Sequence, residues 1–202
     1  MLPMTRWFVR LLIVGGAAAL LPSGSAAQQW PRFRGPNGSG ESETILPAKW
    51  SDADYVWKIE LPGSGHSSPV LWGNQLWVTS ALSHQQRLLI SIDARNGKIL
   101  WQREFTCTGH PIHKQNSFAS SSPTVDADHV YVAWATPEAY RVYALGHDGR
   151  AVWEADLGPY ESQHGFGASP IIYKELLILN SDQDGDSALW ALDRKTGEPI
   201  YP

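Results

Sequence analysis

The stretch Leu88-Leu89-Ile90-Ser91-Ile92-Asp93-Ala94-Arg95-Asn96-Gly97-Lys98-Ile99-Leu100-Trp101 decides the fold of this chain. It consists of a short apolar strand, a polar turn closed by glycine, and a second strand that ends in an aromatic residue. The same order returns at 142–153 and 189–201, each time downstream of a Ser-Pro pair and an apolar run. The pairs begin at Ser68, Ser122 and Ser169, at intervals of 54 and 47 residues. This period, with four strands per unit, predicts an all-β β-propeller of four-stranded antiparallel blades.

The repeated turn carries residues for which we predict a structural role. An Asp at its start can accept backbone N–H groups, and a Gly can adopt the positive φ that most residues avoid. The aromatic residue four positions after the Gly can fill the wedge between blades, while a substrate-stacking role is the alternative. The second unit has a shorter turn, Gly146-His147-Asp148-Gly149. The residues assigned to this motif are Asp93, Gly97, Trp101, Gly149, Trp153, Asp193, Gly197 and Tyr201.

The chain divides into three predicted regions. Residues 1–27 have a positive start at Arg6 and Arg10, an apolar run at 11–21 and a small-residue site before Gln28, which is typical of a signal peptide. The apolar run is shorter than the ~20 residues of a membrane span, although an uncleaved anchor is the alternative. Residues 28–49 are expected to form an irregular arm that packs Trp30 and Phe33 on the flank of the propeller. The repeats occupy 50–202, with blades at about 64–106, 118–157 and 166–202.

Charge and cysteine content narrow the partners and the compartment. Residues 1–27 hold two of the 16 basic residues and none of the 20 acidic ones, so the remaining chain carries a net charge of −6. This sign argues against nucleic acid or an anionic membrane surface as the main partner. Cys107 is the single cysteine, so no internal disulfide is possible, and no lipid-attachment cysteine follows the apolar run. We expect a periplasmic or secreted protein without a stable membrane span after cleavage.

The three turn segments, 93–101, 146–153 and 193–201, resemble the tryptophan-docking motif of the pyrroloquinoline-quinone-like (PQQ-like) β-propeller repeat proteins. The resemblance covers about residues 50–202. The second unit lacks the first Asp, and the third has Pro199 and ends in Tyr201. The arm at 30–40 and the segments 66–69 and 163–167 resemble exported propeller proteins of planctomycete-type bacteria.

The family resemblance implies two functions of different classes. Quinoprotein dehydrogenases of this kind use a vicinal cysteine pair, a calcium ion held by Glu, Asn and Asp, and an Asp base. One cysteine cannot make that pair, although some sugar-oxidising relatives also lack it. We therefore expect a non-catalytic exported scaffold that binds a protein or glycan at its loop face, with no cofactor. The alternative is a PQQ-dependent oxidoreductase with calcium.

Loop residues upstream of the blade openings are the candidate ligand-binding residues. His66, His113 and His164 precede the Ser-Pro prolines by 3, 10 and 6 residues, and loops that feed the inner strands of a propeller gather at one mouth of its channel. Gln163 lies beside His164 and joins this set. Metal coordination by the histidines and hydrogen bonding of loop histidines to backbone are both open interpretations. His110 is placed similarly.

A second candidate is the acidic stretch Asp182-Gln183-Asp184-Gly185-Asp186-Ser187. Carboxylates at alternate positions, Asp182, Asp184 and Asp186, occur in calcium loops. The Gly comes too early for an EF-hand and no terminal Glu follows, so a hairpin turn between two strands is the other interpretation. Neither is excluded by the sequence.

Three units do not close a propeller, since closed rings have about 4–8 blades. An open arc leaves an apolar blade face and strand edges uncovered. We therefore expect either a truncated portion of a longer propeller or an assembly in which another chain supplies further blades.

Overall fold

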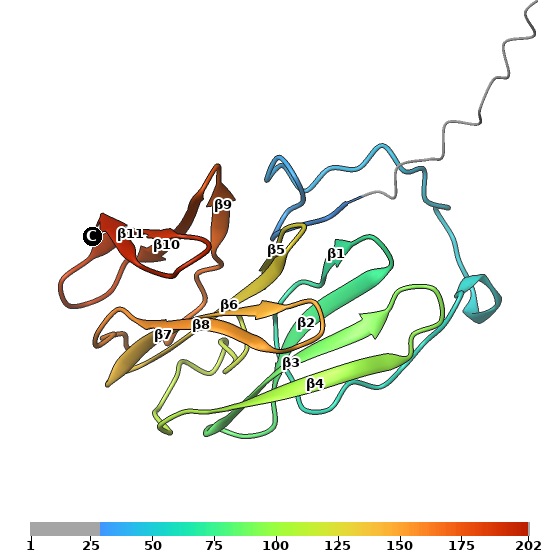
Figure 1. Cartoon of the computed structure of the whole chain (residues 1–202). Coiled ribbons are helices and arrows are strands. Elements are labelled where there is room, and N and C mark those ends of the chain that lie inside the picture. The colour runs from blue at the N-terminus through green and yellow to red at the C-terminus, as the bar shows by residue number, and fades with distance from the viewer. Residues whose placement is uncertain (1–28, 202) are drawn as a thin grey trace, which may run out of the picture.

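The computed structural model describes residues 29–201, which form three four-stranded antiparallel sheets (Figure 1). The first blade contains β1 (Val70–Trp72), β2 (Gln75–Ala81), β3 (Gln86–Asp93) and β4 (Ile99–Thr106). The second blade contains β5 (Thr124–Val125), β6 (His129–Thr136), β7 (Ala139–Gly146) and β8 (Ala151–Asp156). The third blade contains β9 (Ile171–Tyr173), β10 (Leu176–Ser181), β11 (Ala188–Asp193) and β12 (Pro199–Tyr201). Strands follow one another in chain order across each sheet, which confirms the predicted propeller blades in an incomplete ring.

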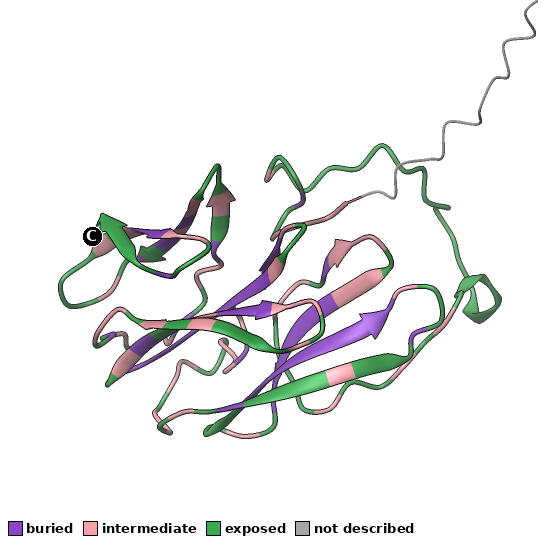
Figure 2. Ribbon diagram, viewed as in Figure 1, coloured by how far each residue is buried: buried purple, intermediate pink, exposed green. Residues whose placement is uncertain are grey.

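The second blade lies in the middle of the apolar core. Val130, Val132 and Trp134 of β6 pack with residues of the first blade. Tyr131 and Ala133, the alternate residues of the same strand, pack with the third blade. Successive side chains of a strand point to opposite faces, so β6 is apolar on both sides because a blade covers each side. Figure 2 shows the buried middle strands β3 and β6 and the largely exposed outer strand β4.

The segment 55–61 covers the other face of the first blade without strand geometry. Trp57 and Ile59 pack on Val78 and Leu88 of that face. The Trp57 Nε1–H donates to the carbonyl oxygen of Ala94 at 2.7 Å. No strand of residues 29–201 pairs with this segment, so it binds through side chains and not through a backbone ladder.

The arm lies on the inner strands and not on the flank of the propeller. The backbone of Trp30 exchanges hydrogen bonds of 2.9 and 2.8 Å with Leu71 of β1, and the carbonyl oxygen of Pro31 accepts the N–H of Val125 of β5. β1 and β5 are in contact across the first two blades, and the arm runs beside both strands (Figure 1). Phe33 is 48% exposed, so its expected packing is wrong. The backbone bonds explain the placement, because β1 and β5 present unpaired edges that the arm covers.

The loops gather at two ends of the arc. The β1–β2 and β3–β4 turns of the first blade and their counterparts in the other two blades lie at one end, called the turn end, and comprise 73–74, 94–98, 126–128, 147–150, 174–175 and 194–198. The links between the blades and the β2–β3, β6–β7 and β10–β11 connections lie at the other end, called the connector end, and comprise 62–69, 82–85, 107–123, 137–138, 157–170 and 182–187. The signal peptide predicted for 1–27 falls outside the described residues. Residues 29–201 contain no helix with the length and apolar character needed to cross a bilayer.

Candidate ligand-binding site at the connector end

The serines of the Ser-Pro pairs join the blades at the connector end. The N–H of Ser68 donates to Ser122 Oγ at 2.8 Å, and the N–H of Ser122 donates to Ser169 Oγ at 3.0 Å. Each hydroxyl thus accepts a backbone N–H from the preceding blade. Because the same bond recurs between successive blades, the connectors before each pair reach the same end of the molecule.

His113 and His164, two of the predicted candidates, lie side by side. Their ring centroids are 5.4 Å apart and their planes are nearly perpendicular. Asn116 fixes the pair, since its Nδ2 donates to the carbonyl oxygen of His164 at 2.7 Å and its N–H donates to the carbonyl oxygen of His113. His164 is exposed and His113 is half-buried. Two imidazoles from separate connectors are therefore held at one surface position.

His66 lies at the same end but is held differently. Its side chain is exposed, and its backbone N–H faces Ser117 Oγ and the carbonyl oxygen of Ala119, both at 3.1 Å. It therefore borders the connector that carries His113. Across residues 29–201, no three His, Cys, Asp or Glu side chains are grouped so that they could hold a metal ion.

Gln163 is exposed beside His164, and its backbone contacts the acidic stretch 182–187. Its N–H donates to Asp184 Oδ2 at 2.9 Å, while the N–H of Asp184 donates to the carbonyl oxygen of Glu161 at 2.8 Å. The structure therefore brings Gln163 next to the second predicted candidate, a relationship that the sequence did not indicate.

The acidic stretch connects β10 to β11 and is held by its own polar groups. Ser187 Oγ lies 3.2 Å from the carbonyl oxygen of Gln183 and 3.5 Å from Asp182 Oδ1. The Gln183 Nε2 donates to the carbonyl oxygen of Asp186 at 2.7 Å. Asp182, Asp184 and Asp186 thus belong to a hydrogen-bonded connection between two strands. They do not form a group of three side chains that could hold a metal ion.

A hollow of about 380 Å³ opens beside Gln163. Apolar and aromatic groups dominate its lining, which consists of His110, Pro111, Thr136, Pro137, Tyr160, Ser162, Gln163 and Gly165. The residues that line the hollow come from the two connectors that carry His113 and His164 and from the β6–β7 turn. Concave, mainly apolar surfaces with a few polar groups are typical of binding sites.

Tyr160 lines the hollow but was not among the ligand-binding residues predicted from the sequence. Its ring packs edge-on against Phe166 at 5.4 Å and against Tyr140 at 5.8 Å, and its hydroxyl donates to the carbonyl oxygen of Asp182 at 3.1 Å. Burial, followed by the nearby Asp182 and Asp184, raises the pKa of Tyr160 above its usual value, so the phenol stays neutral. The sequence feature that could have indicated Tyr160 is the presence of an aromatic residue within a polar connector.

No family model matches the chain, and no curated protein matches it. Among solved structures, the chain is similar to a europium-containing methanol dehydrogenase, with 15% identity, a TM-score of 0.48, and coverage of 69% of this chain and 24% of that chain. It is also similar to BamB from Moraxella catarrhalis, with 16% identity, a TM-score of 0.44, and coverage of 71% of this chain and 53% of that chain. The chain thus spans about a quarter of the first structure and about half of the second.

Proposed function

We propose that this chain is an exported, non-catalytic β-propeller scaffold that binds a protein segment at its connector end. The observation that carries this proposal is the mainly apolar hollow at Tyr160, Pro111 and Pro137, beside the exposed Gln163 and His164. An apolar side chain of a peptide can enter such a hollow while polar groups at its rim hydrogen-bond the peptide backbone. A glycan, the other expected partner, has few apolar groups to fill it.

The test is a direct binding measurement with the full chain. Arrays of peptides and of glycans are probed with labelled protein, and the strongest ligand is measured by fluorescence polarisation. The double substitution Gln163→Ala/His164→Ala should weaken peptide binding about tenfold. The matched control is Lys195→Ala, an exposed residue with 65% side-chain exposure at the turn end, which should leave binding unchanged. Glycan binding alone, or equal loss in both variants, would overturn the proposal.

The quinoprotein alternative concerns PQQ with calcium. Cys107 as the single cysteine cannot form the vicinal pair, which some sugar-oxidising relatives also lack, and within residues 29–201 no three potential metal ligands are grouped. No catalytic step is therefore derived through that cofactor. Addition of PQQ with Ca²⁺ tests the alternative: quenching of tryptophan fluorescence together with dye reduction would favour the enzyme over the scaffold.

Export is the part of the proposal that depends on residues 1–27, whose composition is typical of a signal peptide. Expression of the full chain in a Gram-negative host, followed by N-terminal sequencing of the periplasmic fraction, should give a product that begins at Gln28. Retention of residues 1–27 in the cell membrane would favour the uncleaved anchor.

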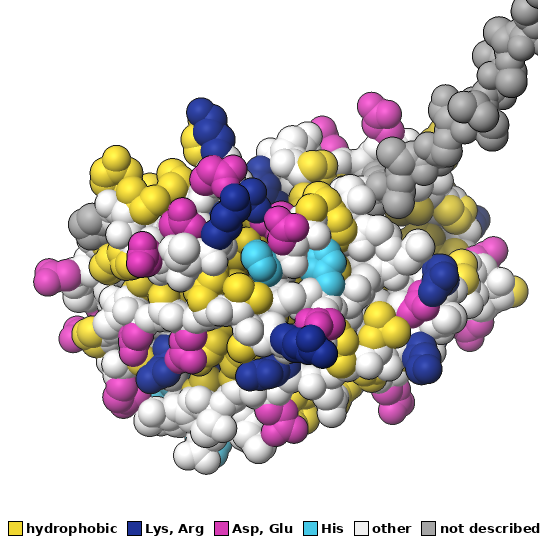
Figure 3. Space-filling model, in the orientation of Figure 1, with side chains coloured by type: hydrophobic (Ala, Val, Ile, Leu, Met, Phe, Trp, Pro, Cys, Tyr) yellow, Lys and Arg dark blue, Asp and Glu magenta, His cyan; other side chains and the backbone are white. Residues whose placement is uncertain are grey.

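We also propose that further blades, in the same or another chain, cover the third blade. Ile171, Tyr173, Leu189, Ile200 and Tyr201 are 36–63% exposed there. Figure 3 shows apolar side chains over this blade, beside charged side chains of both signs. Native mass measurement should show a discrete multimer if other chains cover the blade. A stable monomer that binds no apolar dye would argue against any such cover.

A further inference from the structure

The third blade exposes a face that the first two blades bury against their neighbours. We call this the forward face, because it points toward the next blade along the chain. Two of its positions lie on equivalent strands, and in the first two blades their residues are fully buried: Trp77 and Leu89 in the first, Tyr131 and Val142 in the second. At the same positions in the third blade, Ile178 is half-buried and Leu189 is 62% exposed. This forward face is therefore an interblade surface without a neighbour among residues 29–201.

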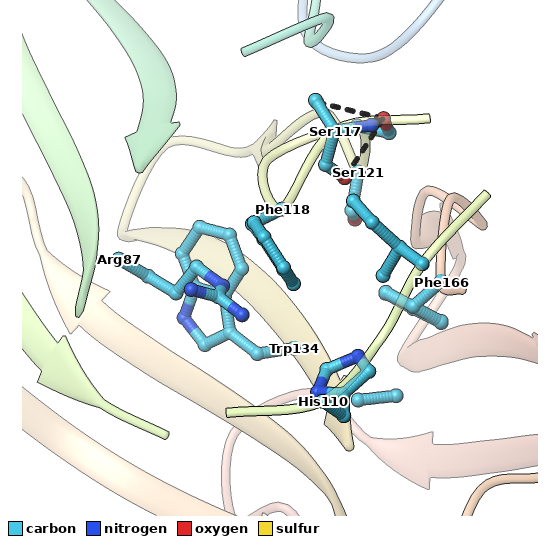
Figure 4. A pocket seen from close by; sticks show the side chains of 10 residues that line it. Arg87, His110, Ser117, Phe118, Ser121, Trp134 and Phe166 are labelled. Atoms are coloured by element: carbon cyan, nitrogen blue, oxygen red, sulfur yellow. Dashed lines mark hydrogen bonds between the residues drawn. The ribbon is translucent and has the colours of Figure 1, made fainter. Parts of the chain in front are cut away.

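Figure 4 shows how completely a following blade closes such a face. Arg87 of β3 lies on the forward face of the first blade, and Trp134 of β6 in the second blade lies on the same side of the pocket. The ring of Phe118, from the connector between these blades, is 4.5 Å from the guanidinium carbon of Arg87. Even this long charged side chain is only 2% exposed. Contact with a neighbouring blade thus removes almost the whole forward face from water.

Residues 55–60 have the features of an outer strand that lacks its own blade. Trp57 and Ile59 are half-buried between exposed residues, which is also the burial pattern of β8 around Trp153. The Trp57 Nε1–H donates to a carbonyl oxygen of the β3–β4 turn at 2.7 Å, as the Trp153 Nε1–H donates to the β11–β12 turn at 3.1 Å. Trp57 therefore lies on the first blade in the position that the outer strand of a preceding blade would take.

The backbone of this segment is free to pair. Residues 55–61 form no backbone–backbone hydrogen bond within the described part of the chain. A row of unpaired N–H and C=O groups can add to the edge of another sheet. Because the indole of Trp57 holds the segment against the first blade, a sheet that pairs with the segment must be a blade stacked on the first one.

The third blade has a free edge of the matching kind. In the first blade, β4 pairs with residues 86–92 of β3. In the third blade, β12 pairs only with Ala191 and Leu192, so the outer edge of 188–190 has no strand partner within residues 29–201. Pro199 has no N–H to donate to the ladder, and all three residues of β12 are exposed. The strand β12 is therefore a short and weakly held outer strand.

We propose that residues 55–61 complete the third blade of a second copy of this chain. In the register that β4 has on β3, Trp57 takes the place of Tyr201 opposite Ala191, and Glu60 lies opposite Ala188 of the second copy. The three residues of β12 give way, while Trp57 keeps its contact with its own first blade. Each copy gives one strand and receives one, so the contact is isologous.

Two copies are the number that closes the ring. Each copy contributes three blades, and six is the only multiple of three within the range of about 4–8 blades found in closed propellers. The exchange also places the forward face of each third blade against the first blade of the other copy. It rests on the proposed cover of the third blade and deepens that proposal by naming the partner.

Disulfide cross-linking of the full chain tests the pairing. Glu60→Cys and Ala188→Cys are combined in a Cys107→Ala background and the protein is oxidised. Residues opposite each other in an antiparallel pair have Cα atoms about 4.5–5.5 Å apart, which a disulfide can span. Within one copy the two positions belong to opposite ends of the arc, with the second blade between them (Figure 1). We therefore expect a dimer on non-reducing gels, with a 60–188 bond identified by peptide mass spectrometry.

The matched control combines Glu60→Cys with Lys195→Cys in the same background, because Lys195 is exposed in the turn beyond β11 and does not lie opposite Glu60 in the proposed register. The native mass of the unsubstituted chain is the second readout and should equal that of two copies. Equal cross-linking of the control, or a dimer without the 60–188 bond, would overturn the pairing but not the cover of the third blade. A monomer that binds an apolar dye would do the same, whereas a monomer that binds no dye would overturn both.

Discussion

Trp153 of the second blade lies directly on Gly197 of the third blade. The Trp153 Nε1–H donates to the carbonyl oxygen of Arg194 at 3.1 Å, and a Cβ placed on Gly197 would meet the indole at 2.6 Å. The same relationship joins Trp101 to Gly149 and Trp57 to Gly97. Each aromatic residue therefore belongs to one unit but packs on the glycine turn of the next, so the repeated turn is an interblade contact.

Gly197→Ala should destabilise the chain through this contact. The φ of +77° already disfavours a side chain, and the added methyl group would overlap the Trp153 ring. We expect a loss of about 2–4 kcal/mol in the free energy of unfolding. Urea unfolding followed by tryptophan fluorescence measures it.

Gly73→Ala is the matched control for that substitution. Gly73 also has a positive φ, 59°, but nothing lies within 4 Å of its added Cβ. It should lose only the conformational part, about 1–2 kcal/mol. Equal losses at the two positions would show that the indole contact contributes nothing.

Asp93 should make the free energy of unfolding depend on pH in the acidic range. The side-chain hydrogen bond from Arg95, then the backbone N–H of the same residue, lower the pKa of Asp93 to about 2. Since an unfolded Asp titrates near 3.9, its ionised form stabilises the fold above about pH 4 and this contribution is lost as the pH falls to about 2. The difference in melting temperature between the chain and Asp93→Asn should shrink over that interval.

Arg95→Met tests the cause of the Asp93 shift. Loss of the Arg95 side chain removes the largest interaction that lowers the pKa of Asp93. The pH interval over which stability is lost should therefore move upward, toward pH 4. An unchanged interval would assign the lowered pKa to the backbone of the turn.

The sequence predicted the blades and an aromatic residue in the wedge between them, but not which turn each aromatic residue contacts. Asp93, Gly97 and Trp101 indicate a strand, a turn and a strand because turn chemistry and side-chain alternation are local. Which turn receives Trp101 depends on the next blade, and no spacing within one unit specifies that. The position of the arm on β1 and β5 was not predicted for a related reason. An exposed strand edge pairs with the backbone of another segment, so few side chains in that segment indicate the pairing.

The candidate site was predicted in part. The Ser-Pro positions indicated that His113 and His164 share one end of the arc, because loops preceding equivalent strands gather there. Tyr160 in the hollow and the buried Arg87 of β3 could not be identified in this way, because their environments depend on packing between blades. A buried arginine within a strand has the same sequence pattern as one whose guanidinium reaches water.

The pair Asp126–Arg194 should contribute to the contact between the second and third blades. Arg194 Nη1 donates to Asp126 Oδ2, and the side chains of Arg194 and Asp126 are 17% and 14% exposed. Arg194→Met removes the cation but leaves the Asp126 carboxylate its hydrogen bonds from the Asp128 N–H, the His129 N–H and the Tyr131 hydroxyl. The substitution should cost about 1–3 kcal/mol, because a half-removed buried pair keeps its desolvation penalty.

A double-mutant cycle isolates the contribution of this pair. Arg194→Met/Asp126→Leu removes both charges, and the double variant should be less destabilised than the sum of the single variants by about 1–3 kcal/mol. Chemical unfolding of all four proteins measures the coupling. Additive losses would mean that the two side chains stabilise the fold independently.

Ser122→Ala should weaken the serine connection between the blades. The substitution leaves the N–H of Ser68 without the Ser122 Oγ that accepts it at 2.8 Å. An unsatisfied N–H at a half-buried residue such as Ser68 costs about 1 kcal/mol, so the chemical unfolding midpoint should fall accordingly. The neighbouring Ser121 gives the control, because its hydroxyl is equally buried but has no partner. Ser121→Ala should be nearly neutral. A loss equal to that of Ser122→Ala would attribute both effects to packing of the hydroxyl oxygen and not to the bond from Ser68.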